Sequence, residues 1–354
     1  MTRHMVNMGD GSRVFMSREQ VMDDIRAGVA DAADCTGVPD LSADEMDFIC
    51  EIMCDSNRVV GVEPGNEVVM TEDFGGNRFG IDSGTCGNGI ELGRRESSLI
   101  FEKAWSMDTF ELGHTDYSIK AVKPIIAHEM QTMEQMQMLM TVPLLYGTMP
   151  NMGLYYIPDG PYGNPADLMR EFKIEEAMAA AEAAADHLAR DIRFVSVKMQ
   201  EAGSDGFDFD TTASAGDADF VGTLRGVAEL RRERPEANIM MGMAGENILG
   251  IHGAIEYDGK AVAGMYPHEQ VKLAEKVGVN VFGPVVNTNT GRSTAWNVAR
   301  AVSITKECVK KSSIPIHPNM GMGVGGIPMS ETPPVEAATR ASKAMIEVAK
   351  ADGI

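Results

Sequence analysis

Basic residues and long apolar runs are both scarce in this sequence. The chain has 31 Lys and Arg against 52 Asp and Glu, a formal net charge of −21, so it repels phosphate backbones and anionic lipid headgroups. No run of about 18 apolar residues is present, and the first residues, MTRHMVNMGDGSRVFMS, lack the apolar stretch of a secretory signal. These absences argue against nucleic acid and membranes as partners and predict a cytoplasmic protein.

Cysteine is also scarce. The five cysteines form an odd set in a chain of 354 residues, which predicts reduced thiols rather than a disulfide framework. Cys50 and Cys54 lie four residues apart on a predicted helix, a spacing at which two thiolates can share a metal ion. With no nearby histidine or CxxC partner, we favour ordinary packing of both side chains.

Several short catalytic motifs are missing. The sequence has no HExxH, no Cys and His pair at ligand spacing and no GxSxG, so neither a metal site nor a serine hydrolase is expected. One glycine-rich loop, Gly321–Pro328, follows a predicted strand and offers backbone amides to a phosphate. Because no lysine or helix start stands directly behind it, we favour a plain tight turn.

The first hundred residues differ in pattern from the rest. Ser17–Gln20 and Ser42–Glu45 are capping boxes that predict two helix starts. Residues 58–71 predict two short strands around a Pro-Gly turn, and the glycine-rich residues 74–89 predict a loop. We interpret residues 1–105 as an N-terminal α+β appendage, or cap.

From residue 106 onward, short β-like runs alternate with helical patterns, which is typical of βα units and a parallel sheet. Strands are predicted at residues 109–114, 142–147, 207–212, 238–244, 279–285 and 314–321. Helices are predicted at residues 124–139, 165–202, 217–234, 267–277, 293–311 and 334–351.

The predicted fold class is α/β, a (β/α)8 TIM-type barrel spanning residues 106–354. Such a barrel needs eight βα units, whereas this chain supplies about six. The end of the chain, Asp352-Gly353-Ile354, matches the entry to the third predicted strand, where a helix also leaves through Asp-Gly into an apolar residue. We therefore expect Ile354 to begin a seventh strand of a C-terminally truncated barrel. An open, doubly wound sheet is the alternative.

The candidate site residues follow the predicted strands, where barrels of this type keep their active sites. The residues with catalytic or substrate-binding potential are Tyr155, Tyr156, Asp208, Asp210, Glu246, Asn287 and His317. Further polar residues at strand ends are His114, Asp116, Tyr117, Asn151, Thr211, Thr212, Asn289 and Asn319.

Each main candidate has a functional and a structural interpretation. Glu246, after the small residues Ala244 and Gly245, is the first choice for a general base. Asp208 and Asp210 share one face of a strand and are either second choices or a satisfied polar layer inside a barrel.

The remaining candidates are aromatic or histidine side chains. Tyr155 and Tyr156 have the chemistry to enclose an alkylammonium by cation–π attraction, or are half core and half surface. His317, between Pro315 and Pro318, is a proton carrier or a loop brace.

Long stretches of the sequence resemble the dimethylamine:corrinoid methyltransferases of methylotrophic methanogens. The resemblance begins at MGDGSRVF and covers essentially the whole chain. It lies in TFELGHTDYSIKAVKP, MPNMGLYYIPDGPYGNPADLM, FDFDTTASAGDADFVGTL, GMAGENILGIHG, NVFGPVVNTNTGRSTAWNVARAV, MGMGVGGIPMSETPP and ATRASKAMIEVAKADGI.

This resemblance implies an enzyme that moves a methyl group from dimethylamine to the cobalt(I) of a corrinoid held by a cognate corrinoid protein, leaving monomethylamine, in methanogenesis from methylamines. No cofactor would be bound directly, and the full-length protein is expected to be a homo-oligomer. The family's electrophile is pyrrolysine, an amber-encoded residue with a reactive imine carbon. In the family pattern it comes directly after the position of Ile354.

Two interpretations of the chain follow from the resemblance. In the first, these residues are the portion of a dimethylamine methyltransferase that precedes the amber codon. In the second, the polypeptide that ends at Ile354 is an inactive fragment, with an open sheet edge. A barrel lyase that lacks pyrrolysine is a third possibility. We expect the 354-residue chain alone to be inactive.

Overall fold

The computed structural model describes residues 2–68, 73–74, 77–79, 90–92, 110–112, 144–148, 152–204, 206–210, 212–251, 255–321, 323–330 and 333–354. The chain forms two compact units that are discontinuous in sequence. Unit 1 contains residues 1–69, 267–271 and 283–354, and unit 2 contains residues 70–266 and 272–282. The predicted domain boundary at residues 105–106 lies outside the described residues and stays a prediction.

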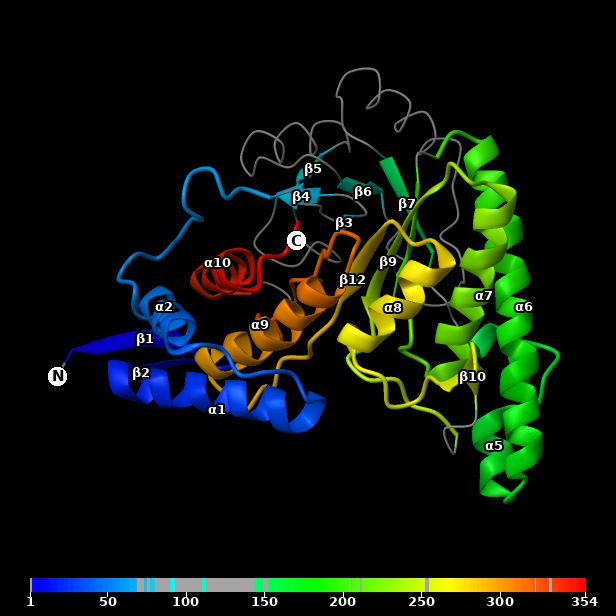
Figure 1. The fold of residues 1–354 in the computed structure, drawn as a ribbon, viewed down its shortest axis with the longest axis horizontal. Helices are drawn as coiled ribbons and strands as arrows, with labels where there is room; N and C mark the ends of the chain where they lie inside the picture. The colour runs from blue at the N-terminus through cyan, green and yellow to red at the C-terminus, as the bar shows by residue number, and fades with distance from the viewer. Residues whose placement is uncertain are drawn as a thin grey trace. The chain divides into compact units, whose positions relative to one another are not determined.

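Unit 2 is built on a parallel sheet (Figure 1) with the strand order β12-β9-β8-β7-β6-β3. The strands are β3 Asp73–Phe74, β6 Phe110–Leu112, β7 Leu144–Thr148, β8 Gly206–Phe209, β9 Asn238–Ala244 and β12 Val281–Pro284. The pairs from β3 to β9 are parallel. Neighbours in the sheet are therefore neighbours in chain order, with no reversal of the kind that defines a doubly wound sheet. The α/β class is confirmed, whereas closure into a barrel and its truncation stay predictions.

Unit 2 also contains two long helices, α6 Ile174–Glu201 and α7 Asp217–Glu233. Two further helical elements of unit 2 are η1 Met152–Tyr155 and α5 Pro165–Arg170. Helices α6 and α7 lie side by side (Figure 1) because small residues face each other. A Cβ atom on Gly222 would lie 2.8 Å from the Ala185 carbonyl oxygen. Arg225 of α7 also pairs with Glu182 and Asp186 of α6.

Two predictions for unit 2 need correction, and one remains untested. The helix predicted at residues 165–202 is two helices, because Phe172 has a φ of +59° and turns the chain between them. The glycine-rich loop contains part of β3 and all of β4, Asn77–Phe79, which pairs with β5, Ile90–Leu92. The helix predicted at residues 124–139 lies outside the described residues. The predicted strands at 142–147, 207–212 and 238–244 are confirmed as β7, β8 and β9.

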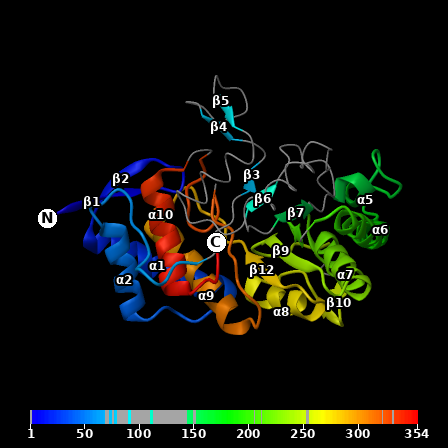
Figure 2. The same ribbon diagram turned by 90° about the horizontal axis from the view of Figure 1, so that it is seen from above.

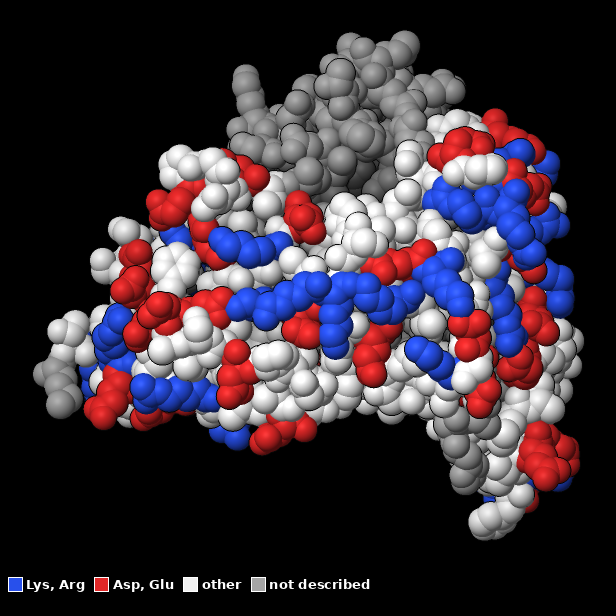
Figure 3. Space-filling view, in the orientation of Figure 1, with Lys and Arg blue, Asp and Glu red and all other residues white. Residues whose placement is uncertain are grey.

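Unit 2 also contains a small hairpin of β10, Glu256–Tyr257, and β11, Lys260–Ala261. Helix α8, Pro267–Val277, has the predicted bounds. No described helix is long and apolar enough to cross a membrane. On the face drawn in Figure 3, Lys and Arg side chains are interspersed among Asp and Glu rather than segregated.

Unit 1 joins the two ends of the sequence in one core. Its elements are β1 Arg3–Asn7, β2 Arg13–Ser17, α1 Arg18–Thr36, α2 Ala43–Cys54, α9 Thr294–Lys311, α10 Val335–Ala344 and the π-helical turn η2 Met345–Ala349. Figure 2 shows α1, α2, α9 and α10 grouped together. One cluster of buried side chains extends from Val6 to Cys54 and from Val286 to Ala351. N-terminal and C-terminal residues therefore fold as one body here.

Both predicted capping boxes are confirmed. The Ser17 hydroxyl accepts from the Gln20 amide at the start of α1, and the Ser42 hydroxyl accepts from the Glu45 amide at the start of α2. The strands predicted at residues 58–71 are wrong for residues 58–68, which form an irregular segment with a turn at Pro64-Gly65. This segment is held by side chains of α10 and η2 rather than by strand pairing. Glu347 accepts from the Glu63 amide, for example.

The four described cysteines, Cys35, Cys50, Cys54 and Cys308, are free thiols. Burial raises the pKa of Cys54 to about 12, so this thiol stays protonated and packs in the core of unit 1.

The last residues of the chain are anchored in unit 1. The Asp352 amide donates to the Ile316 carbonyl oxygen at 2.9 Å, and the Ile316 amide donates to the Asp352 carboxylate at 2.8 Å. Ile354 packs, partly buried, against the core. The strand predicted at residues 314–321 is reduced to a short bridge at Ile316, and the backbone turns at Gly323, Gly325 and Gly326.

The contact between α1 and α9 depends on a glycine. A Cβ atom on Gly28 would lie 2.2 Å from the Trp296 carbonyl oxygen, and a backbone atom of a buried helix cannot move aside easily. Gly28→Ala should gain about 1 kcal/mol of helix propensity but lose more through overpacking. We expect a net loss of about 1–3 kcal/mol in the free energy of unfolding, measured in urea.

Gly61→Ala is the matched control, since nothing lies within 4 Å of the added Cβ and its φ is not positive. An equal loss of stability in both variants would contradict close helix packing at Gly28.

Candidate functional site

Acidic side chains gather at the carboxyl ends of β8 and β9 in unit 2. Strand β8 lies between β7 and β9, and Asp208 is paired in register with Met240. Asp210 follows β8 directly. The side chains of Asp208 and Asp210 are only 7% and 6% exposed, so the sheet holds two carboxylates away from bulk water.

A glycine on β9 makes room for Asp208. A Cβ atom on Gly242 would lie 2.7 Å from Asp208 Oδ1 and 3.3 Å from Oδ2. A glycine inside a strand often marks such a close approach. The carboxylate therefore lies over the β9 backbone, in a place that any larger residue at position 242 would fill.

The loop after β8 leads into α7 and brings two further carboxylates. Asp217 and Asp219 occupy the first turn of α7. One oxygen of Asp219 accepts from the Ala215 amide at 2.6 Å, which ties the helix start back to the loop. Ala213 has a φ of +68°, so the loop is strained at one position.

The loop after β9 packs against this segment. The Gly245 amide donates to the Thr212 carbonyl oxygen at 2.8 Å, and the Asp217 amide donates to the Leu249 carbonyl oxygen at 2.6 Å. A Cβ atom on Gly250 would lie 2.3 Å from Asp217 Oδ2. Glu246 is half-buried and stands within this loop, so the structure places it in the segment that contacts the acidic residues.

We define the acidic cluster as Asp208 and Asp210, on and directly after β8, with Asp217 and Asp219 in the first turn of α7. Burial changes the proton affinity of the two α7 carboxylates. Desolvation raises the pKa of Asp217 to about 6, against backbone amide hydrogen bonds that lower it. Desolvation raises the pKa of the fully buried Asp219 carboxyl well above its ordinary value, and the charge of Asp217 adds to the effect. Perturbed carboxylates of this kind are typical of functional sites, though structural networks also contain them.

Two buried oxygens of the α7 carboxylates have no hydrogen-bond partner among the described residues. They are Asp217 Oδ2 and Asp219 Oδ1. The hydroxyl oxygen of Thr212 is likewise buried without a hydrogen-bond partner. Leaving polar atoms buried in this way costs free energy of folding, about 1–3 kcal/mol for each group. An ordered water, a proton or a ligand can satisfy such atoms, which makes Asp217 and Asp219 candidates for a site in unit 2.

The two tyrosines differ in their surroundings. Tyr156 is near the cluster: burial, followed by the charges of Asp219 and Asp217, raises its pKa to about 12. Tyr155 is buried, and its hydroxyl donates to Asp191 of α6 at 2.9 Å. Its ring also packs on His187, with 4.9 Å between ring centroids. The structure thus brings Tyr156 to the acidic residues and fixes Tyr155 on α6.

The other predicted site residues belong to unit 1. Asn287 is exposed and forms a bridge with Val324. His317 is buried, and desolvation lowers the pKa of its imidazole to about 4. A neutral histidine at physiological pH can accept a proton only weakly. The roles of Asn287 and His317 as substrate-binding residues stay predictions, and His114, Asp116, Tyr117, Asn151 and Thr211 lie outside the described residues.

Sequence reasoning missed Asp217 and Asp219. Acidic residues in the first turn of a helix are common because they favour the helix dipole, so AGDADF has the pattern of an ordinary helix start. The useful signal is that the residues around these acids, Ala218, Phe220 and Val221, are all apolar, which predicts a buried helix end. In the described part of the chain, no group of three or more His, Cys, Asp or Glu side chains is arranged to hold a metal ion.

The raised pKa of Asp217 predicts a pH-dependent cost in stability. The pKa of Asp217 is 3.8 in the unfolded chain and about 6 in the folded protein, so the folded state binds the proton more tightly. The free energy of unfolding therefore falls as the pH rises from about 4 to about 6, and it is lowest above that range. Asp217→Asn should raise the free energy of unfolding by about 1–2 kcal/mol near pH 8 and by less near pH 5.

Chemical denaturation at the two pH values measures this difference. Asp159→Asn, at an exposed position of the same unit, is the control and should show no pH-dependent gain. A gain from Asp217→Asn that is equal at both pH values would contradict the raised pKa.

Comparison with known proteins relates the chain to one protein family and to several solved structures. A model of the dimethylamine methyltransferase family matches residues 2–354. Among solved structures, the homocysteine methyltransferase of Escherichia coli is similar at 11% identity and a TM-score of 0.37, covering 81% of this chain and 100% of its own. A dihydropteroate synthase of Xanthomonas albilineans is similar at 16% identity and a TM-score of 0.35, covering 80% and 83%.

The carboxyl transferase domain of Rhizobium etli pyruvate carboxylase is similar at 12% identity and a TM-score of 0.39, covering 95% of this chain and 50% of its own. Structural similarity at this level assigns neither a reaction nor a substrate. The match to the family model is of a different kind, because it spans 353 of 354 positions, from residue 2 to residue 354. This chain belongs to the dimethylamine methyltransferase family.

Proposed function

We propose that the protein transfers a methyl group from dimethylamine to the cobalt(I) of a corrinoid carried by a cognate protein, releasing monomethylamine. The family match over residues 2–354 carries this proposal. The acidic cluster supports it, because dimethylamine is a cation at neutral pH and carboxylates in a partly dry site attract an alkylammonium. The corrinoid is a substrate of the reaction, held by the partner protein.

The bond changes set what the protein must do. Cobalt(I) gives its electron pair to one methyl carbon, the carbon–nitrogen bond breaks, and nitrogen keeps the bonding pair as it leaves as methylamine. An amine is a poor leaving group, so the nitrogen needs a controlled proton and a fixed orientation. Positioning of this kind can supply about 7–11 kcal/mol of the barrier reduction.

The carboxylates of unit 2 have the chemistry to manage that proton. Glu246 is our first choice as the group that accepts a proton from dimethylammonium and returns it to the nitrogen as the carbon–nitrogen bond breaks, so that methylamine leaves. Asp208 or Asp210 are the second choices. Asp219, with its raised pKa, would keep a proton and orient its neighbours rather than accept one. Tyr156 would present an aromatic face to the methyl groups.

Pyrrolysine, which the family resemblance places after Ile354, would supply an electrophilic imine carbon that holds the amine. The described end of the chain suits such a residue, since Asp352 is bonded to Ile316 through both its amide and its carboxylate. An anchored backbone can present a reactive side chain in a fixed direction.

The reading frame tests the expected position of pyrrolysine. The codon after Ile354 should be UAG, followed by an open frame, and the intact mass of the protein from its natural source should exceed that of 354 residues. The polypeptide of 354 residues alone should not methylate the corrinoid protein. A UAA or UGA codon, or methyl transfer by the 354-residue polypeptide, would overturn this part of the proposal.

Substitution of Glu246 tests the proton acceptor in the naturally translated protein. Glu246→Gln keeps the shape of the side chain but cannot accept a proton, so kcat for dimethylamine should fall by about 100-fold or more. The assay is the appearance of the methyl-cobalt(III) spectrum on the cognate corrinoid protein. Monomethylamine and trimethylamine serve as comparison substrates.

Glu256→Gln is the matched control, because Glu256 is exposed on the nearby β10 hairpin. It should leave kcat unchanged. Full activity in Glu246→Gln would move the role to Asp208 or Asp210. Absence of dimethylamine-dependent methylation in the unaltered, full-length protein would refute the proposed function itself.

A further inference from the structure

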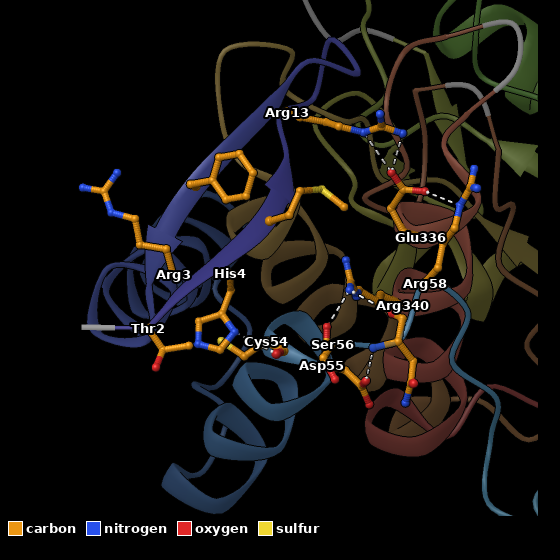
Figure 4. A pocket seen from close by; sticks show the side chains of 13 residues that line it. Thr2, Arg3, His4, Arg13, Cys54, Asp55, Ser56, Arg58, Glu336 and Arg340 are labelled. Atoms are coloured by element: carbon orange, nitrogen blue, oxygen red, sulfur yellow. Dashed lines mark hydrogen bonds and ion pairs between the residues drawn. The ribbon is translucent and has the colours of Figure 1, made fainter.

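A basic pocket in unit 1 has no role in the proposed reaction. Its volume is about 740 Å³, and it lies between the β1–β2 hairpin, the C-terminal end of α2 and the first turns of α10 (Figure 4). A pocket of this size falls in the range of small-molecule sites, about 300–1,000 Å³. The lining residues that matter for its chemistry are Arg13, Ser56, Asn57, Arg58, Glu336 and Arg340.

Two arginines approach one carboxylate in this pocket (Figure 4). Arg13 donates to Glu336 Oε1 through Nε at 3.1 Å and through Nη2 at 2.9 Å. Arg58 Nε lies 3.7 Å from Glu336 Oε2. The charge of Arg340 also acts on Glu336. The Glu336 side chain is only 1% exposed, so the arginines approach a carboxylate that water does not reach.

Structural roles account for only part of this set. Arg340 donates to the carbonyl oxygens of Asp55 at 2.8 Å and Asn57 at 3.2 Å, directly after α2 ends, which is a typical way to satisfy a helix C-terminus. Arg13 alone is enough to pair with Glu336. Arg58 adds only a longer ion pair to Glu336, at 3.7 Å, and its side chain is 74% exposed.

The cluster has an excess of positive charge. Four arginines, Arg3, Arg13, Arg58 and Arg340, line the pocket against two carboxylates, Asp55 and Glu336. This leaves a local charge of about +2, in a chain whose net charge is −21. Burial opposes ionisation of Glu336, but its own backbone amide and the two arginines Arg13 and Arg58 together lower its pKa. The carboxylate is therefore charged at neutral pH and already fully compensated.

Hydrogen-bonding capacity remains unused as well. Among the described residues, Arg340 Nε and Glu336 Oε2 are buried without a hydrogen-bond partner. Each guanidinium has five N–H donors, and the bonds described above use two of those on Arg13. The side chains of Arg13 and Arg58 are 57% and 74% exposed, so their remaining donors are open to solvent. Ser56 and Asn57, which also line the pocket, are exposed too.

We propose that this pocket binds a small phosphate-bearing anion, held by Arg58 and Arg13 with Ser56 and Asn57 at the rim. A guanidinium presents parallel N–H groups that match two oxygens of a phosphate. The concave shape suits a small molecule. An acidic protein surface would instead have to approach a chain with a large net negative charge. This inference does not depend on the proposed methyl transfer.

The bound anion would stabilise a particular part of the fold. The pocket joins the hairpin, the end of α2 and α10, and α10 continues through η2 to the anchored Ile354. A ligand that binds only the folded state adds stability that grows with the logarithm of its concentration. Occupancy of the pocket would therefore hold α10 and the C-terminal segment more firmly.

Calorimetric titration with inorganic phosphate, against chloride at equal ionic strength, tests the proposal on the full-length protein. A second titration with glycerol phosphate distinguishes free phosphate from a phosphorylated small molecule as the preferred ligand. Arg58→Gln should weaken binding by about tenfold or more, because a hydrogen bond to a charged group is lost. Glu336→Gln should tighten binding, since it removes the competing negative charge but keeps the size of the side chain.

Arg26→Gln is the matched control, because Arg26 is an exposed arginine of α1 in the same unit and outside the pocket. Circular dichroism checks that every variant is folded. Should Glu336→Gln unfold, the contrast between Arg58→Gln and Arg26→Gln still decides the question. Equal effects of phosphate and chloride, or equal affinity in Arg58→Gln and Arg26→Gln, would overturn the proposal. Binding of polyglutamate without binding of either phosphate would overturn it too.

Discussion

The parallel pairing of β8 with β9 is the constraint on which the acidic cluster depends. Because Asp208 is in register with Met240, its carboxylate reaches Gly242, two residues further along β9, where a Cβ atom would collide with it. A one-residue slip would turn both Asp208 and Asp210 to the other face of the sheet. Strand register and the glycine together therefore decide on which face of the sheet Asp208 and Asp210 lie, and whether the Asp208 carboxylate has room there.

That site is costly to the fold. Burial raises the pKa of Asp217 and Asp219, so ionisation of either one opposes folding at neutral pH. Backbone amides from the loop and the first turn of α7 recover part of this energy, since one Asp219 oxygen is bonded to Ala215. The positive end of the helix dipole acts in the same direction. A local loss of folding stability is typical of binding sites and active sites.

Much of the fold follows from local sequence signals. The capping boxes at Ser17 and Ser42 fix helix starts, because side chain and backbone satisfy each other within four residues. Alternation of βα units predicts β7, β8, β9 and α7 with small errors at their ends. The division between α5 and α6 could not be predicted, because Phe172 adopts a positive φ without a glycine. Residues 58–68 have a strand-like composition but find side-chain partners on α10 and η2, which only tertiary structure can show.

The two sites also differ in how far local sequence predicts them. Strand ends indicate Asp208, Asp210 and Glu246, since position along a strand is a local property. The basic pocket joins Arg13 to Glu336 across 323 positions of sequence, and no local pattern marks such a pair. Helix α10 links the basic pocket to the end of the chain. It carries Glu336 and Arg340, its buried residues belong to the same core as those of α2, and it leads directly to η2. The N-terminal helices therefore help to set the backbone at Ile354. A change near residue 13 or 58 can reach the C-terminal segment through α10, and through the contact of Glu63 with Glu347 of η2.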